Sequence, residues 1–496
     1  MASNHVFLCT ILIQFFLVFA AKSMLPSNPK IVVVGGGVSG IAAATKLVEK
    51  GFNDVILLEA EDRLGGRVYT VPFGDSHVDL GAHWVHGEVG NPVFEIASRL
   101  DLLKNSQDFT SIEFVADDGY QFPADVGMEL YESGYSILTK TEELLKSRGS
   151  VEAYLVPRFE ELAREKIKDP ATLKAFTDWL VKFECTIEGC DRLSEPSING
   201  LTHYKTCDGD ATLCWKQGGY NNIVNILLGQ HPSAPKENPL NGKVFLNSEV
   251  TEIDWSGLTG FVRIKDGRTV VADHIIVTVS LGVLKEKHGA IFKPKLPQEK
   301  IKAIQGLGIG TVDKIYLKFE RRWWPKDCSG FSLLRKNQSA PLETGEHSWE
   351  RDLIGFYAES TSPNVLGGWV VGDAAREMET STDAQVMAGC MRTLRKFLGS
   401  RYEIPDPQTI IRSKWYTNSH FRGSYSYRSV STDVLNTSAA ALAEPVKNFY
   451  GKEMLFFAGE ATHDYFYSTV HGALESGWRE GERLATKYRK VAKCSL

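Results

Sequence analysis

The sequence is short of several features that would place it in a specialised class. It has no internal repeat and no low-complexity stretch, as expected of an ordinary globular protein. It has no excess of basic residues: the formal net charge is −5, which argues against a nucleic-acid surface. This balance suits a cationic substrate but is too common to decide the matter. After the first residues, no hydrophobic run suggests a membrane span in the mature chain.

Cysteine is also scarce, with eight in 496 residues. Cys185, Cys190, Cys207 and Cys214 form a cluster whose pairing the sequence does not determine. A zinc site is the alternative reading of this cluster, but neither pair has the C-x-x-C spacing of a zinc knuckle. We therefore expect no metal. If Cys9 is removed with the N-terminal segment, an odd number remains, so at least one thiol is free or paired to another chain.

The N-terminal segment contains the apolar run Val6–Ala21, followed by small residues suited to cleavage around 20–23. The run is short for a membrane span, which needs roughly 20 residues. We expect residues 1–23 to be a signal peptide and the protein to be secreted, with an uncleaved anchor as the alternative. Glycosylation sequons at Asn337 and Asn436 agree with secretion.

The chain is too long for a single core, which predicts two domains. The first domain opens with an apolar strand at 31–34, followed by a glycine-rich turn, an Ala-rich helix and a second strand that ends on Glu59. Gly35 permits the tight turn, Gly37 lets the backbone approach a diphosphate, and Gly40 lets helix and strand pack closely. Glu59 is placed to accept hydrogen bonds from a ribose. This stretch predicts a dinucleotide site.

A second glycine pair, Gly65-Gly66, and then Arg67 follow the ribose acid at once. A nicotinamide enzyme has no evident need for them, whereas an extended flavin adenine dinucleotide (FAD) has a diphosphate that a second loop and a guanidinium can cover. The Gly-aromatic segment 81–87, which contains Trp84 and His86, comes soon after. We therefore expect FAD as the cofactor.

The C-terminal part carries the most specific motifs: Phe-Phe-Ala-Gly-Glu at 456–460, Tyr-Ser-Thr-Val-His-Gly-Ala at 467–473 and Ser-Gly at 476–477. Together with the glycine motifs, they resemble the flavin-containing amine oxidase family from about Ile31 to about Lys487. Within the family, the residues of these motifs are most similar to those of animal polyamine oxidases.

The resemblance implies an α/β fold, α+β overall, in which a Rossmann-like FAD-binding domain is interleaved with a sheet-and-helix substrate domain. We assign residues 28–105, 215–300 and 412–490 to the FAD domain and residues 106–214 and 301–411 to the substrate domain. The cofactor-binding residues that motif and resemblance indicate are Gly35, Gly37, Gly40, Glu59, Arg67, Trp84, Val250, Gly459, Glu460, Thr469 and Val470.

The resemblance also suggests how FAD is held and which residue is catalytic. Monoamine oxidases link FAD to a cysteine, and Ser424 stands at that position here, so we expect noncovalent FAD. Tyr425 matches the first tyrosine of their aromatic cage, whereas Thr469 replaces the second. The lysine that points at the flavin and holds a water near its N5 atom is expected at Lys300.

Substrate-binding residues are expected at three further places. Glu188, with Glu184 as second choice, resembles the acid that faces the amine in polyamine oxidases; two solvated helix-end carboxylates are an equally good reading. His86 either contacts an amine nitrogen or satisfies a hydrogen bond in the core. Tyr425 is expected to line the flavin face.

The implied reaction moves a hydride equivalent from the carbon beside a neutral amine to flavin, in a dry site. The imine hydrolyses, and dioxygen reoxidises the flavin to give hydrogen peroxide. The expected partners are a small cationic amine such as spermine, spermidine or an N-acetylated form, and dioxygen. An L-amino acid oxidase and a catalytically silent flavin-fold binding protein are the alternatives.

Overall fold

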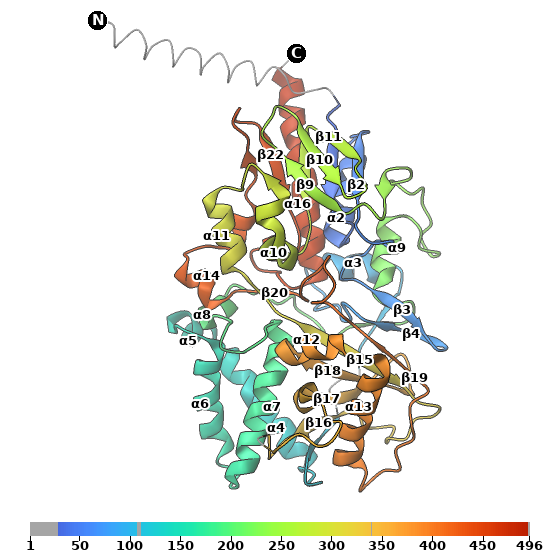
Figure 1. Cartoon of the computed structure of the whole chain (residues 1–496), viewed down its shortest axis with the longest axis vertical. Coiled ribbons are helices and arrows are strands. Elements are labelled where there is room, and N and C mark those ends of the chain that lie inside the picture. The colour runs from blue at the N-terminus through green and yellow to red at the C-terminus, as the bar shows by residue number, and fades with distance from the viewer. Residues whose placement is uncertain (1–27, 107–110, 339, 495–496) are drawn as a thin grey trace, which may run out of the picture.

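The computed structural model describes residues 28–106, 111–338 and 340–494, with side chains up to residue 489. The expected signal peptide at 1–23 lies outside the described residues. Two halves stack along the longest axis of the molecule (Figure 1), and each is built on a sheet of its own. Both described ends of the chain lie at the tip of the same half.

The upper half in Figure 1 contains a six-stranded sheet in the order β21-β22-β12-β1-β2-β8. Its inner strands read as continuous apolar runs because both faces are covered. Three separate stretches of the chain supply the strands, as an interleaved domain requires. Their bounds are β1 Ile31–Val34, β2 Val55–Leu58, β8 Val244–Phe245, β12 His274–Val277, β21 Val446–Lys447 and β22 Glu453–Phe457.

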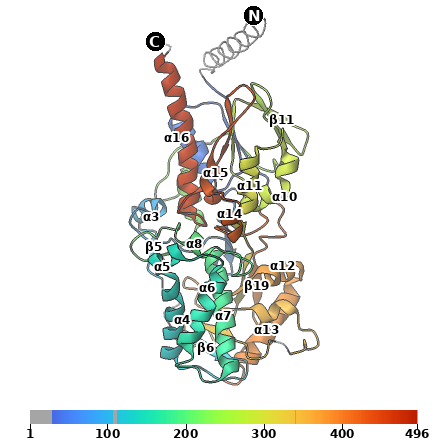
Figure 2. The same cartoon turned by 90° about the vertical axis from the view of Figure 1, so that its left-hand side faces the viewer.

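Helices α2 (Val38–Glu49) and α16 (Val470–Cys494) pack against each other beside this sheet. Their contact is close because Gly477 of α16 faces the backbone of α2: a Cβ at Gly477 would lie 2.2 Å from the Ser39 carbonyl oxygen. Figure 2 shows α16 running along the whole side of this half. The packing aligns the start of both helices at the same end of the sheet.

A second, smaller sheet of the same half has the order β11-β10-β9-β13. The sequence predicts strands at 243–254, 260–265 and 269–272, and the structure has strands in each of these stretches, the first of them interrupted between β8 and β9. In the sequence, helix α10 comes directly before β13 and helix α11 comes after it. The bounds are β9 Val250–Asp254, β10 Gly260–Ile264, β11 Thr269–Ala272, α10 Leu281–Ile291, β13 Phe292–Lys293 and α11 Gln298–Gly306.

The lower half is a six-stranded sheet with helices on both faces, in the order β19-β15-β18-β17-β16-β6. Alternate residues of β6 show the two faces: Phe114 packs with Phe176 under α4, α6 and α7, whereas Val115 packs with Phe397 under α13. The bounds are β6 Ile112–Ala116, β15 Val312–Lys318, β16 Gly330–Leu334, β17 Gly355–Ala358, β18 Val365–Val371, β19 Thr409–Arg412, α4 Ala124–Leu138, α6 Val151–Ala163, α7 Pro170–Glu188, α12 Gly372–Thr380 and α13 Asp383–Leu398.

The long helical stretch expected over 152–183 is divided in the structure into α6 and α7. The division has a local cause at Asp169, whose carboxylate accepts a hydrogen bond from the Thr172 amide (3.0 Å), and at Pro170, which opens α7. The stretch expected over 130–145 is likewise divided into α4 and α5 (Thr141–Lys146).

Short elements complete the fold and connect the halves. They are β3 Thr70–Phe73, β4 Ser76–Asp79, α3 Pro92–Ser98, β5 Leu103–Lys104, α8 Ile198–Leu201, β7 Cys214–Trp215, α9 Asn221–Leu227, β14 Gly308–Ile309, β20 Ser426–Tyr427, α14 Val430–Val434, α15 Ala439–Ala443 and the 3₁₀ turns Ser348–Asp352 and Glu460–Thr462.

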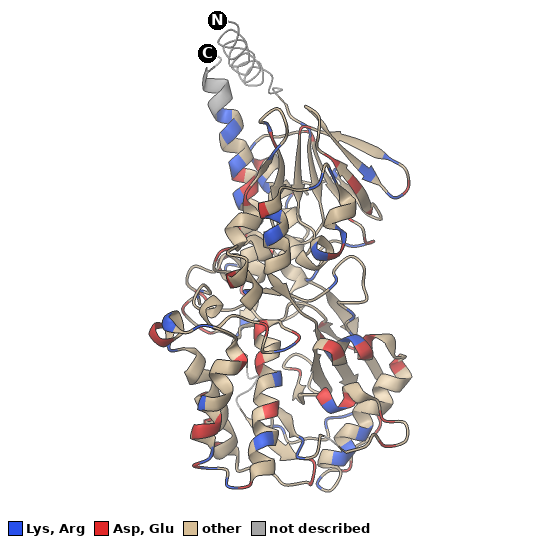
Figure 3. Cartoon of the chain, turned by 60° about the vertical axis from the view of Figure 1, so that its left-hand side comes forward, with Lys and Arg blue, Asp and Glu red and all other residues tan. Residues whose placement is uncertain are grey.

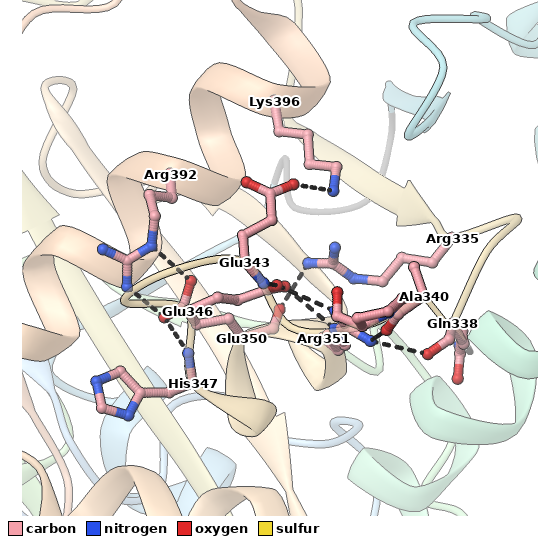
Figure 4. Close-up of polar contacts among 11 residues, drawn as sticks. Arg335, Gln338, Ala340, Glu343, Glu346, His347, Glu350, Arg351, Arg392 and Lys396 are labelled. Atoms are coloured by element: carbon pink, nitrogen blue, oxygen red, sulfur yellow. Dashed lines mark hydrogen bonds and ion pairs between the residues drawn. The ribbon is translucent and has the colours of Figure 1, made fainter.

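Charged side chains are interspersed over both halves (Figure 3). A paired network lies where the 335–351 segment meets α13: Arg392 donates to Glu350, and Arg351 forms an ion pair with Glu346 at 3.0 Å (Figure 4). The Arg392–Glu350 pair joins the connecting segment to α13, and the Arg351–Glu346 pair lies within the segment. No helix among residues 28–106, 111–338 and 340–494 has the length and apolar character to cross a bilayer.

Candidate active site

A cavity of about 1030 Å³ is lined by residues from both halves of the molecule. It begins at the carboxyl ends of β1 and β2 in the upper half, where parallel sheets bind their ligands. From there it passes β15 and β18 and reaches the end of α7. The predicted site residues that line it are Gly35, Gly37, Glu59, Arg67, Trp84, His86, Glu184, Glu188, Val250, Tyr425, Gly459, Glu460, Thr469 and Val470.

The first glycine turn has the predicted geometry. Gly35 has a φ of 111°, a left-handed conformation that favours glycine. Gly37 caps α2 without a side-chain hydrogen bond, so the first amides of the helix remain available to a ligand. Gly40 lies outside the cavity lining and acts in packing, because a Cβ there would come 1.9 Å from the Gly35 carbonyl oxygen.

Glu59 lies at the tip of β2 with its carboxylate held in place by two main-chain amides. Gly36 donates to it at 2.6 Å and Glu61 at 2.8 Å. Burial nevertheless raises the pKa of Glu59, because desolvation outweighs these two hydrogen bonds. A carboxyl fixed in this way beside the glycine turn is suited to accept hydrogen bonds from ribose hydroxyls.

Arg67 joins the second glycine loop to the C-terminal motif. Its guanidinium donates to the Glu460 carboxylate at 2.9 Å and to the Ser424 carbonyl at 2.7 Å. Glu460 also accepts from the Ser426 hydroxyl at 2.6 Å and from the Ser468 amide at 2.8 Å. Three segments distant in the sequence, at Arg67, at 424–426 and at 460–468, are therefore tied together beside the glycine loops.

The start of α16 forms the opposite wall of this groove. Gly459 has a φ of 128°, and a Cβ there would meet no atom within 4 Å, so the backbone faces open space. Thr469 and Val470 begin α16 and line the cavity, as does Val250 at the start of β9. Two helix starts, two glycine loops and a ribose acid in one groove fit the diphosphate and ribose of a bound FAD.

Beyond the dinucleotide groove the cavity is lined by aromatic rings. Trp84 stacks against Trp369 of β18 at a centroid distance of 5.7 Å. The Lys314 ammonium of β15 lies 5.3 Å from the Trp369 ring and donates to the carbonyls of Asp79 (3.0 Å) and Gly81 (2.8 Å). This lysine lines the cavity and is 7% exposed.

Lys300, the lysine predicted to face the flavin, does not line the cavity, and this prediction is corrected by the structure. Its ammonium donates to the carbonyls of Ala441 (2.9 Å), Leu442 (2.6 Å) and Glu444 (2.5 Å) at the end of α15. Burial lowers the pKa of Lys300 to about 7. The residue fastens α11 to α15.

The far end of the cavity is acidic. Glu184 and Glu188, one turn apart on α7, both line it, and neither pairs with a basic side chain of the described residues. One Glu184 oxygen is buried without a hydrogen-bond partner. Burial raises the pKa of Glu184 to about 8, with a further contribution from the charge of Glu188, and raises the pKa of Glu188 to about 7.

His86 and Tyr425 lie between these two ends. The His86 ring faces the cavity and bonds the Ala211 carbonyl through Nδ1 at 2.8 Å, so one nitrogen has a protein partner. Burial away from bulk solvent lowers the pKa of His86. The Tyr425 hydroxyl donates to the Thr186 carbonyl of α7. Tyr425 thereby connects the flavin-facing segment to the helix that carries the acids.

Sequence reasoning missed Lys314, Trp369 and a group of cavity-lining tyrosines. These tyrosines are Tyr131, Tyr135, Tyr204, Tyr357 and Tyr467. A signal for Lys314 exists in the sequence: Asp313 and Lys314 interrupt an otherwise apolar strand. Charged residues inside a buried strand are costly unless they are paired or functional.

Comparisons with known proteins agree with this geometry. A model of the family described as flavin containing amine oxidoreductase matches residues 38–485. The peroxisomal N(1)-acetyl-spermine/spermidine oxidase of Homo sapiens is 33% identical over 491 residues, covering 92% of this chain and 95% of the relative. Polyamine oxidase 1 of Zea mays is 29% identical over 473 residues, covering 92% and 90%.

Among solved structures, a redesigned putrescine oxidase double mutant superimposes with a TM-score of 0.66 at 18% identity, covering 92% of this chain and 99% of that one. This likeness concerns the fold. The chain belongs to the flavin-containing amine oxidoreductase family. It is an amine oxidase with FAD as its cofactor, which the dinucleotide groove fits.

Proposed function

We propose that this chain is a secreted polyamine oxidase that holds FAD noncovalently and oxidises an amine of spermine, spermidine or an N-acetylated form. The observation that carries the substrate class is the pair Glu184 and Glu188 at the far end of the cavity. A buried carboxyl (Glu184) and a half-buried one (Glu188), neither with a basic partner, are unfavourable as charged groups in this cavity. A ligand that carries an ammonium group away from its reacting nitrogen supplies the missing partner. The relatives named for polyamine oxidation support the same choice.

FAD, when bound, accepts the hydride equivalent from the carbon beside the reacting nitrogen and passes electrons to dioxygen. The protein's part is to hold that carbon in place and keep water out. Trp84, Trp369 and Tyr425 supply apolar walls around the middle of the cavity. A dry wall favours the neutral amine that the reaction needs, because burial disfavours an ammonium there.

The resemblance implies a lysine that points at the flavin and holds a water near its N5 atom. We assign this role to Lys314. Its ammonium lies over the Trp369 ring and is oriented by the two carbonyls of the 79–81 segment. A positioned amine at this point can hold a water and take up or give back a proton during turnover.

An L-amino acid oxidase would use an arginine to clamp the substrate carboxylate. Among the described residues that line the cavity, Arg67 is the one arginine, and it is bonded to Glu460 and to the Ser424 carbonyl. The acidic far wall would also repel a carboxylate. Both observations favour the polyamine over the amino acid.

Secretion is supported by the apolar run at 6–21 and by the exposed position of Asn436, the acceptor of one sequon, in the turn between α14 and α15. Noncovalent FAD is supported by the Ser424 hydroxyl, which donates to the Val312 carbonyl at 2.9 Å and receives the Val312 amide at 2.8 Å.

The test is a peroxide assay of the flavin-replete protein with spermine, spermidine, N-acetylspermine and a panel of L-amino acids. We expect peroxide with at least one polyamine and none with the amino acids. Peroxide from amino acids alone would contradict the proposed substrate class. FAD bound without peroxide from any amine would favour a silent binding protein.

A further inference from the structure

The end of α7 brings two cysteines of the unassigned cluster together. The helix ends at Gly189, which has a left-handed φ of 72°, and the chain then folds back. The Cys190 amide donates to the Cys185 carbonyl at 3.2 Å across this turn. In helix ends of this type, the two residues joined by that hydrogen bond commonly place their side chains in contact. The turn accordingly brings the Cys190 and Cys185 thiols close enough for Cys185 to raise the pKa of Cys190.

Both thiols are buried in the core of the substrate half, with Cys185 3% exposed and Cys190 fully covered. Burial raises the pKa of the Cys190 thiol, and the contact with Cys185 raises it further. A buried thiol of this kind reacts slowly with solvent oxidants once the protein is folded. A covalent bond between the two sulfurs would therefore form while the turn is still accessible and would later be protected.

The turn lies against the active site. A Cβ at Gly189 would come 2.3 Å from the Tyr425 ring, and the Thr186 carbonyl accepts the Tyr425 hydroxyl. Glu184 and Glu188 flank Cys185 on the same helix end. Whatever restrains this turn also restrains the two carboxyls in the cavity wall.

The rest of the fold holds this stretch by noncovalent contacts: the Gly189 carbonyl accepts the Gly310 amide at 2.8 Å, and a second anchor follows the turn. The Asp191 carboxylate accepts the Thr311 amide at 2.8 Å and pairs with Arg376, which fixes the chain to the sheet. Between that anchor and α7, the chain passes through Gly189, a residue with wide conformational freedom. A disulfide between Cys185 and Cys190 would join the two sides of Gly189 covalently.

We propose that Cys185 and Cys190 form a disulfide that fastens the acid-bearing end of α7 to the Asp191 anchor and so positions Glu184 and Glu188 for substrate. The effect on the amine rests on the proposed function; the bond itself does not. It forms by exchange with a small disulfide such as glutathione disulfide. The two thiols lose two protons and two electrons as their S–S bond forms, and the small disulfide breaks into two thiols.

The first test is on the covalent bond. Full-chain protein is unfolded and refolded with FAD in glutathione buffers from fully reduced to fully oxidised, quenched in acid, alkylated in denaturant and digested without reductant. We expect a peptide holding both cysteines, two hydrogens lighter and unalkylated, in the oxidising buffers, and both cysteines alkylated in the reducing ones. Two separately alkylated or glutathionylated cysteines in the most oxidising buffer would overturn the disulfide.

The second test is on position. Refolding the parent in the reducing buffer, or Cys190→Ser, should raise KM for spermine by about fivefold while kcat stays within about twofold, since remote contacts contribute uniform binding. Cys328→Ser, which removes a buried thiol on the other face of the sheet, is the matched control and should change neither. Equal KM in both redox states would overturn the positioning role. A linked peptide in a protein that oxidises no amine would instead contradict the proposed function.

Discussion

Glu188→Gln tests the substrate assignment because it removes one charge from the cavity wall and keeps the size of the side chain. An ammonium 4 Å from a carboxylate is attracted by about 4 kcal/mol at an effective dielectric constant of about 20. Since burial raises the pKa of Glu188 to about 7, ionising it near neutral pH costs only about 0.4 kcal/mol. Desolvation of the ammonium offsets part of the attraction that remains after this cost.

The net loss expected for a hydrogen bond to a charged group is about 1.5–3 kcal/mol, which corresponds to a rise in KM of roughly 10- to 150-fold. The turnover number should change far less, because the contact is remote from the reacting carbon. Steady-state peroxide production with spermine measures both constants. Asp178→Asn is the matched control on the same helix, since Asp178 pairs with Lys174 at the surface. An unchanged KM in a folded, flavin-replete Glu188→Gln protein would refute the reasoning.

Four further outcomes are expected. Acid denaturation should release intact FAD into the supernatant, because the Ser424 hydroxyl is bonded to the main chain of Val312; colour that stays in the pellet would contradict noncovalent binding. Lys314→Met should lower turnover by about 100-fold or more. Lys300→Met should leave turnover within about twofold and lower the melting temperature, because it removes three main-chain hydrogen bonds. Rapid-mixing kinetics and thermal melts test both variants, and a larger loss of turnover in Lys300→Met would contradict the assignment. Without substrate, the free energy of unfolding should fall as pH rises between the unfolded pKa of Glu184, 4.5, and its folded pKa of about 8, because the folded state holds the proton more tightly. Glu184→Gln should flatten this pH dependence, measured by melts at several pH values. The same pH dependence in the parent and the variant would argue against a buried neutral carboxyl. The mature chain should begin near residue 21 to 24 and carry N-linked sugar; N-terminal sequencing that finds Met1, with no glycosidase shift, would favour an uncleaved segment.

The dinucleotide groove was predictable because the residues that form its first part lie close together in the sequence. Gly35, Gly37 and Glu59 lie within one strand-turn-helix-strand stretch, and each has a backbone requirement that few other residues meet. The C-terminal motif added Gly459 and Glu460 from a second contiguous stretch. The pairing of Arg67 with Glu460 was not visible, since residues so far apart in sequence meet only through the fold.

The amine end of the cavity was harder to predict because it is assembled from several elements. Lys300 was chosen through the resemblance, yet on α11 it lies among Ala303 and Ile304 on the buried face, which turns toward α15. Lys314 occupies a strand whose residues are nearly all buried, so alternation along the strand did not reveal which side faces the cavity. The helical position of Glu184 and Glu188 was correctly located, although their direction required the packing of α7.

The central claim is that bound FAD and an amine meet in this cavity, and anaerobic mixing tests it most directly. Flavin-replete protein is mixed with spermine in the absence of dioxygen, and the flavin absorbance is followed. The account predicts that the oxidised flavin band is lost and returns when air is admitted, with peroxide formed. A band that persists with spermine, spermidine and N-acetylspermine, in a protein that retains its FAD, would contradict it.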